Sequence, residues 1–232
     1  MQVRLISLPR AGHHYLARSI TTVFADSGLY CEAYSCSDSS RNFRDCSYRG
    51  PRPVLVCSTG STVLKTHDFR LDYCPGDDEA CIVLDRRNVG ASLASLYSLE
   101  RRKSAAHNVL DFVWFALARL PYVAGFRNKY QALCANQPEI FRLYFYEDLA
   151  EKFPKPLTEI CELIKRGSLD CVEQSRISFV EPFRPSPSKL PRVVSNFLEL
   201  TCLLLQALPQ PVLKSIVGKI IQVRKSKRKR RA

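Results

Sequence analysis

The chain has 232 residues, of which 46% are hydrophobic, and a formal net charge of +13. This length and composition can bury a sizeable core and predict one α/β domain, while no apolar run reaches the roughly 20 residues of a transmembrane helix. Seven of the positive charges lie between residues 224 and 231 with no acid among them, so the rest of the chain is only moderately basic.

Ten cysteines are present, but neither a CxxC pair nor a CxxC…HxxxH spacing offers a zinc site. The first four residues lead straight into an apolar strand, without the pattern of a signal peptide. We therefore expect reduced, partly buried thiols, no metal and a cytoplasmic protein.

The first turn of the chain predicts an anion site. Leu5–Leu8 has the pattern of a buried strand, Pro9 and Gly12 break it, and a helical pattern follows. A helix N-terminus next to Arg10 suits a phosphate or sulfate. The stretch is not a Walker loop, because it has one Gly, no Lys and two His where hydroxyls would lie. An ordinary strand-to-helix turn is the alternative.

A polar stretch over residues 26–53 predicts an irregular excursion, either a loop lining a substrate pocket or a poorly ordered insertion. Strands are expected at Val54–Cys57 and at Val63–Phe69, and the second carries Lys65, Thr66 and His67 at its end. In open parallel sheets, ligands bind beyond the carboxyl ends of the strands.

Further along, Cys81–Leu84 is a third buried strand, followed by a turn with two arginines and a helix from Val89. Residues 107–135 are helical in pattern with a break expected near Pro121, Ile140–Tyr146 is rich in β-formers, and another helix is expected over Leu157–Lys165. This order predicts a three-layer α/β/α fold with a central parallel sheet.

Four segments together resemble the sulfotransferases that use 3′-phosphoadenosine 5′-phosphosulfate (PAPS). Residues 9–14, Pro-Arg-Ala-Gly-His-His, resemble the 5′-phosphosulfate loop, usually Pro-Lys-Ser-Gly-Thr-Thr, and residues 64–67 resemble the catalytic Lys-Thr-His strand end. Residues 84–95 are similar to the 3′-phosphate segment, and residues 144–149 to a Tyr-Glu-Asp-Leu segment. The resemblance covers residues 3 to about 180 in the family's order.

The resemblance implies a P-loop NTPase-like sulfotransferase fold and transfer of a sulfuryl group from PAPS to a hydroxyl or amine. His67 would be the general base, while Arg10 and Lys65 would stabilise the transferring group. A structural histidine and a solvated strand-end lysine are the alternatives for His67 and Lys65. The implied donor-binding residues are Arg10, Ala11, Gly12, His13, His14, Tyr15, Arg86, Arg87, Ser92, Ser95, Tyr146 and Phe179.

The sequence also departs from the family pattern. Arg10 replaces the usual Lys, and His13 and His14 replace threonines. The Gly-rich loop that closes over the nucleotide is missing, and residues 184–189 with Arg192 are the candidate substitute. The 3′-phosphate segment allows two registers: one pairs Arg87 with Ser95, and the other pairs Arg86 with Ser92. The alternative for Arg86 and Arg87 is an arginine pair exposed to solvent. The alternative for Tyr146 and Phe179 is that they are ordinary core residues.

The acceptor is expected to be a small molecule, glycan or lipid. Two other functions compete with sulfuryl transfer: a nucleotide kinase-like P-loop phosphotransferase, and a non-catalytic anion- or membrane-binding module of the same fold.

The catalytic domain is expected to span residues 1–192, and the C-terminal part that follows has a different composition. Residues 193–223 predict apolar and amphipathic helices packed on or beside that domain, and residues 224–232 a disordered polybasic tail. For residues 212–231 we rank a solvated end first, peripheral contact with an anionic membrane second and nucleic acid third.

Overall fold

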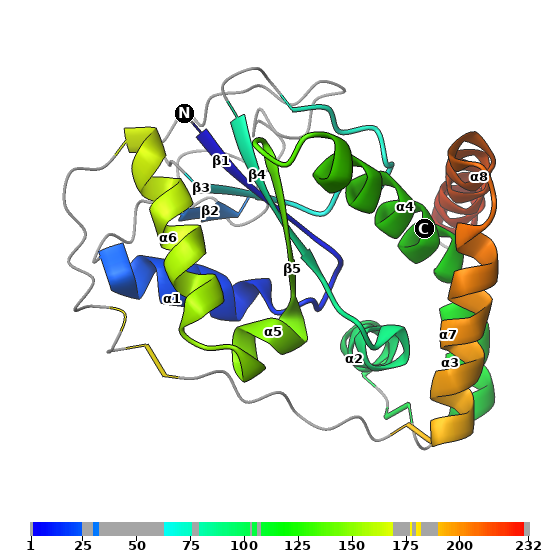
Figure 1. The fold of residues 1–232 in the computed structure, drawn as a ribbon. Helices are drawn as coiled ribbons and strands as arrows, with labels where there is room; N and C mark the ends of the chain where they lie inside the picture. Colours follow the sequence, from blue (N-terminus) through cyan, green and yellow to red (C-terminus); the bar gives the residue numbers. More distant parts are fainter. Residues whose placement is uncertain are drawn as a thin grey trace.

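The computed structural model places β1 (Gln2–Ser7) at the centre of a parallel sheet (Figure 1). Among the described residues, five strands lie in the order β2-β3-β1-β4-β5, and every neighbouring pair is parallel. The other strands are β2 (Tyr30–Glu32), β3 (Val63–Thr66), β4 (Glu79–Asp85) and β5 (Phe141–Phe145). The structure describes residues 2–24, 30–32, 63–75, 79–102, 104–105, 108–168, 177, 180–181 and 190–229.

Helices cover both faces of the sheet, which confirms the predicted α/β class and parallel sheet (Figure 1). α6 packs on α1 and β1 on one face, whereas α4 packs on β5 on the other, where α2, α3, α7 and α8 join it. β4 is buried along its whole length, as expected for a strand covered on both faces. The helices are α1 (His13–Phe24), α2 (Val89–Arg101), α3 (Val109–Leu117), α4 (Leu120–Asn136), α5 (Tyr146–Glu151), α6 (Lys155–Ser168), α7 (Arg192–Gln206) and α8 (Gln210–Lys229).

The sheet changes winding direction between β1 and β4. β1 leads to α1 on one face of the sheet, while the neighbouring β4 leads to α2 on the other face (Figure 1). The two connections diverge at the carboxyl ends of these strands. In open α/β sheets this reversal point is where ligands bind, and the loop at residues 8–12 and the turn at residues 86–88 both lie there.

The helical break expected near Pro121 is confirmed: α3 ends at Leu117 and α4 begins at Leu120, so Pro121 lies in the first turn of α4, where a missing N–H costs nothing. Two details differ from the sequence predictions. β2 is a short edge strand inside the excursion expected to be irregular, and three residues are too few to show a periodic pattern. α8 continues to Lys229, so the basic residues from 224 to 229 extend the helix beyond its expected end. The expected strand Val54–Cys57 lies outside the described residues.

The C-terminal helices share the main core. Leu198 and Cys202 of α7 and Leu213 and Val217 of α8 belong to the same buried cluster as the sheet residues. Within the described residues, no single helix is long and apolar enough to span a bilayer; only α3 and α4 together, bent by 45°, reach that length and composition.

Candidate functional site

The loop after β1 is shaped by two residues in the left-handed backbone region. Arg10 has φ of 67° and Gly12 has φ of 82°, and the N–H of Ala11 donates to the carbonyl of Leu8 at 3.1 Å. A Cβ at position 12 would lie 2.2 Å from the ring of Tyr146, so only glycine fits. The loop is therefore held tightly against the end of β5.

The turn after β4 and the start of α2 meet this loop. Arg10 Nε donates to Ser95 Oγ at 2.9 Å, and Ser92 Oγ donates to the carbonyl of Pro9 at 3.1 Å. Ser92 is buried, and its hydroxyl hydrogen is committed to Pro9, whereas Ser95 is only half-buried. Of the two serines, Ser95 is therefore the one presented beside the arginine.

The two arginines of the turn have different surroundings. Arg87 is half-exposed, donates to Asp148 at 2.7 Å and stacks 4.6 Å from the centre of the Phe145 ring. Arg86 is 9% exposed and stacks 4.5 Å from the centre of the Tyr146 ring. Its Nε has no hydrogen-bond partner among the described residues and lies 3.8 Å from a Glu147 oxygen.

Arg86 therefore lies over Tyr146, which touches Gly12 of the loop, whereas Ser95 contacts Arg10 of the loop. These two residues come one from each predicted register. Burial is the main reason that the pKa of Tyr146 is raised, with Glu147 adding to it and Arg86 and Arg10 opposing it. Tyr146 lies against both Gly12 and Arg86, so it positions the loop and the arginine.

His67 is oriented by the end of β1. Its Nδ1 lies 2.7 Å from the carbonyl oxygen of Ser7 and 3.3 Å from Ser7 Oγ. A carbonyl only accepts hydrogen bonds, so Nδ1 carries the hydrogen, and Nε2 is the basic nitrogen of the neutral ring. The hydroxyl of Tyr122 donates to the His67 carbonyl at 2.5 Å, which fixes the backbone of this residue from α4.

Lys65 lies on β3 two residues before His67, which follows the end of that strand. It is 1% exposed and pairs in register with Leu5 of β1, so the alternative of a solvated strand-end lysine is wrong. Aromatic rings lie next to His67. The centre of the Phe69 ring is 5.2 Å from the centre of the His67 ring and 5.8 Å from the centre of the Tyr122 ring.

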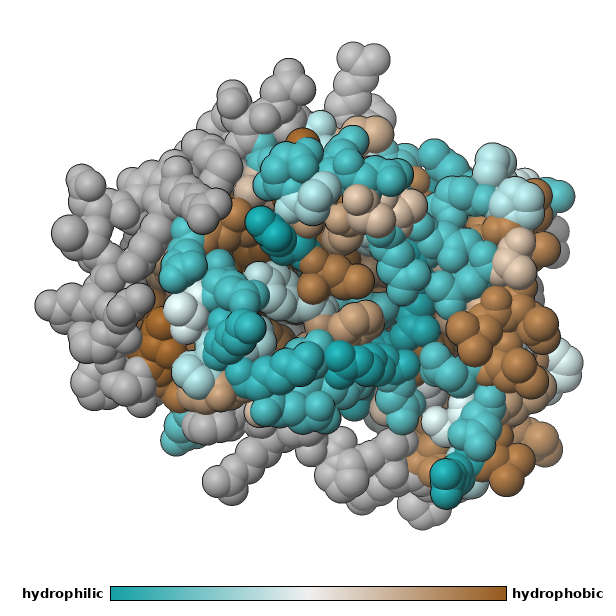
Figure 2. All heavy atoms as spheres, in the orientation of Figure 1, coloured by the Kyte–Doolittle hydropathy of each residue, from teal (hydrophilic) through white to brown (hydrophobic). Residues whose placement is uncertain are grey.

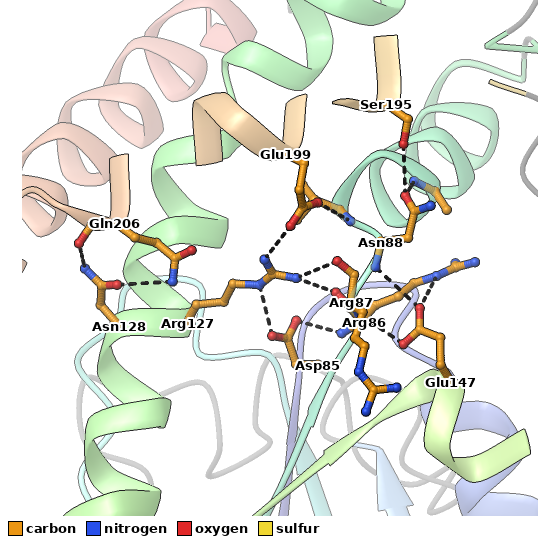
Figure 3. A network of polar contacts seen from close by, with 12 residues as sticks. Asp85, Arg86, Arg87, Asn88, Arg127, Asn128, Glu147, Ser195, Glu199 and Gln206 are labelled. Atoms are coloured by element: carbon orange, nitrogen blue, oxygen red, sulfur yellow. Dashed lines mark hydrogen bonds and ion pairs between the residues drawn. The ribbon is translucent and has the colours of Figure 1, made fainter. Parts of the chain in front are cut away.

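A buried ion-pair network holds the turn after β4 from behind (Figure 3). Arg127 of α4 contacts Asp85 at 3.0 Å and Glu199 of α7 at 3.2 Å, and it donates to the carbonyls of Arg86 and Arg87 at 2.5 and 3.1 Å. Burial raises the pKa of Asp85 to about 6, although Arg127 opposes this rise.

Protein groups also occupy the first N–H groups of α2. Glu147 accepts from Arg87 and Asn88, Glu199 accepts from Val89 at 3.2 Å, and the Asn88 side chain accepts from Ala91 at 2.8 Å (Figure 3). With carboxylates already on this N-terminus, an anion at this corner would bind side chains rather than the end of the helix.

The remaining predicted donor residues are placed only in part. Ala11 is fully buried, His14 is exposed on α1, and the Tyr15 hydroxyl donates to the carbonyl of Glu181 at 3.1 Å. The side chain of His13 and all of Phe179 lie outside the described residues. Within the described part of the chain, no group of three or more His, Cys, Asp or Glu side chains could hold a metal.

Sequence reasoning missed the residues that support the site. Glu147 lies within the Tyr-Glu-Asp-Leu segment, so its neighbourhood carried a signal. Tyr122, Arg127 and Glu199 carried none, because each is one polar residue in an ordinary helical pattern. Their roles follow from contacts between residues that are 55 to 110 positions apart in the sequence.

Comparison with known proteins adds no family: no family model, curated protein or solved structure matches this chain.

Proposed function

We propose that this chain is a PAPS-dependent sulfotransferase with a P-loop NTPase-like sulfotransferase fold. The observation that carries the proposal is the meeting of three motif segments at the reversal point of the sheet. Arg10 contacts Ser95, and His67 is bound to Ser7 at the end of β1. These are the segments that the resemblance assigns to the donor's two phosphate ends and to the base.

The arrangement of cations supports a ligand with two anionic ends. Arg10 is exposed on the loop and suits a 5′-phosphosulfate, together with backbone N–H groups of that loop. Arg86 and Ser95 suit the 3′-phosphate: the buried Arg86 Nε makes no hydrogen bond to a described residue and has Glu147 only at ion-pair distance, 3.8 Å. Arg87 is paired with Asp148 and is assigned no direct contact with the donor.

The same geometry suits sulfuryl transfer to a hydroxyl. PAPS would supply an activated sulfuryl group whose sulfur–oxygen bond to phosphate breaks as the acceptor oxygen attacks. His67 would take the acceptor proton at Nε2, since Nδ1 is held by the Ser7 carbonyl. Arg10 and Lys65 would stabilise the negative charge that forms on the leaving phosphate. Phe69 and Tyr122 would border the acceptor, for which a small molecule, glycan or lipid remains our prediction.

Thermal unfolding with adenosine 3′,5′-bisphosphate tests donor binding. At a hundred times its Kd, the ligand should stabilise the protein by about 2.7 kcal/mol, or roughly 5–10 °C for a chain of this size. Arg10→Gln should weaken this binding by about tenfold to a hundredfold through loss of a charged hydrogen bond. Arg18→Gln, which changes an exposed arginine on α1, is the matched control and should leave the binding unchanged.

The outcomes separate the rival functions. No stabilisation by the bisphosphate would contradict the proposal, and stabilisation by ATP with magnesium alone would favour the phosphotransferase. Binding of the bisphosphate without transfer from sulfur-labelled PAPS to any component of a cell extract would favour the non-catalytic module. Identification of a labelled product would name the acceptor.

A further inference from the structure

An apolar surface is exposed on the side of the molecule away from α1 and α6. Figure 2 shows apolar side chains gathered over α7 at the right-hand side. α3 and α7 pack against each other, and the exposed apolar residues of these two neighbouring helices are here named together the α3/α7 apolar face. Its members are Leu110 and Trp114 on α3 and Val193, Phe197, Leu200, Leu203 and Leu204 on α7.

The spacing of these residues makes the face continuous along each helix. Leu110 and Trp114 are four residues apart and are 79% and 74% exposed. On α7, Val193, Phe197, Leu200 and Leu204 follow each other at helical spacing and share one stripe. A ridge of large apolar side chains on a folded chain marks an interaction surface rather than ordinary scatter.

The charge beside this face indicates what covers it. Residues 201–232 contain nine lysines and arginines and no acid. α8, which carries most of them, lies on the same side of the molecule as α7 (Figure 1). Its Lys214 and Lys219 are exposed, while Leu213 and Val217 pack inward, so these two cations face outward.

We propose that the α3/α7 apolar face and α8 together dock the protein onto an anionic lipid surface. Leucine and phenylalanine side chains would enter the acyl boundary, Trp114 would lie at the headgroup level, and the lysines would contact lipid phosphates and carboxylates. A nucleic acid would satisfy the cations but leave the leucines in water. A second copy would cover the leucines but bring two cationic segments toward each other. This inference does not depend on the proposed catalytic activity.

Trp114 is the only tryptophan of the chain, so its fluorescence reports on this face alone. We expect its emission to shift to shorter wavelength, and acrylamide quenching to fall, when vesicles of phosphatidylcholine with phosphatidylserine are added. High salt should reverse the change, because the cations contribute through screened attraction. An unchanged emission, or an equal response to pure phosphatidylcholine, would overturn the proposal. So would a shift without vesicles that grows with protein concentration, which would indicate a second copy.

Vesicle flotation of variants separates the two components of the surface. Leu203→Glu with Leu204→Glu should abolish binding, and both positions are exposed, so the fold should persist. Lys214→Gln with Lys219→Gln should weaken binding by about 25-fold, at about fivefold per cation. The matched control, Arg18→Gln with Lys155→Gln, removes exposed cations from α1 and α6 and should change binding less than twofold. An equal loss of vesicle binding in the lysine variant and in the control variant would overturn the proposal. Circular dichroism checks that each variant is folded.

Discussion

His67 is oriented by a backbone carbonyl, whereas many catalytic histidines are oriented by a carboxylate. The Ser7 carbonyl is part of the central strand and cannot be protonated, so it holds the Nδ1 hydrogen at any pH at which the fold persists. In the proposed reaction, Ser7 would therefore supply no negative charge to stabilise the imidazolium that would form when His67 takes a proton.

Replacement of His67 by asparagine tests its role as the base. The asparagine amide can still donate to the Ser7 carbonyl, so the strand end should keep its structure. We expect kcat for sulfuryl transfer to fall by about 10²–10⁴-fold, as for other general bases. Labelled PAPS measures transfer, and the thermal shift with adenosine 3′,5′-bisphosphate should be unchanged. Unaltered kcat would show that His67 is a structural histidine.

A pair of glycine substitutions tests the tight contact between the loop and Tyr146. Gly12→Ala places a Cβ 2.2 Å from the Tyr146 ring at φ of 82°, and we expect a loss of about 1–3 kcal/mol in unfolding free energy. Gly218→Ala is the control: this helical glycine has nothing within 4 Å of an added Cβ, so the variant should gain about 0.5–1 kcal/mol. Urea unfolding measures both, and equal effects would contradict the close approach.

Among the elements, the turn from β4 into α2 is built from three other parts of the chain. Arg127 of α4, Glu147 of α5 and Glu199 of α7 all bond to its backbone. These contacts hold the carbonyls and N–H groups of the turn in place, so the side chains of Arg86 and Ser95 extend from a rigid backbone. Such preorganisation favours ligand binding because less conformational freedom is lost.

The pH dependence of stability tests the burial of Asp85 in this network. Its pKa of about 6 lies above the usual value of about 3.9, so the folded chain binds this proton more tightly than the unfolded chain. The resulting stability is fully present below about pH 4 and is lost as the pH rises through about 6. We expect the unfolding free energy of the wild type, relative to Asp85→Asn, to fall over this interval. A difference that grows with pH would mean that Arg127 outweighs burial.

The sequence predicts those parts of the fold whose pattern is visible within a few consecutive residues. The central part of β4, residues 81–84, follows from a continuous apolar run, and the loop at residues 9–12 follows from Pro and Gly next to a helical pattern. Which arginine faces the loop was not predictable, because it depends on the packing of Arg86 over Tyr146, 60 residues away in sequence. The edge strand β2 also escaped prediction, since its pairing with β3 supplies the order that three residues alone lack.

At the scale of the whole molecule, the chemistry and the basic C-terminus are expected to be separable. A chain ending at Val223 loses seven cations but keeps Leu213 and Val217, the buried residues by which α8 joins the core. We expect its unfolding free energy to change by less than about 0.5 kcal/mol and sulfuryl transfer to persist. Vesicle binding should weaken in the same preparation. Loss of all transfer would contradict the assignment of catalysis to the strand ends.

The two surfaces of α7 have a consequence for how this protein can be divided. Leu200 and Leu203 face outward, while the neighbouring Glu199 reaches inward to Arg127 and to the backbone of Val89. A fragment ending at residue 191 would therefore strip Arg127 of one carboxylate partner, leave one N–H of α2 without its acceptor and open the core at Leu198. Residue 192 marks a change in composition and offers no safe place to cut the chain.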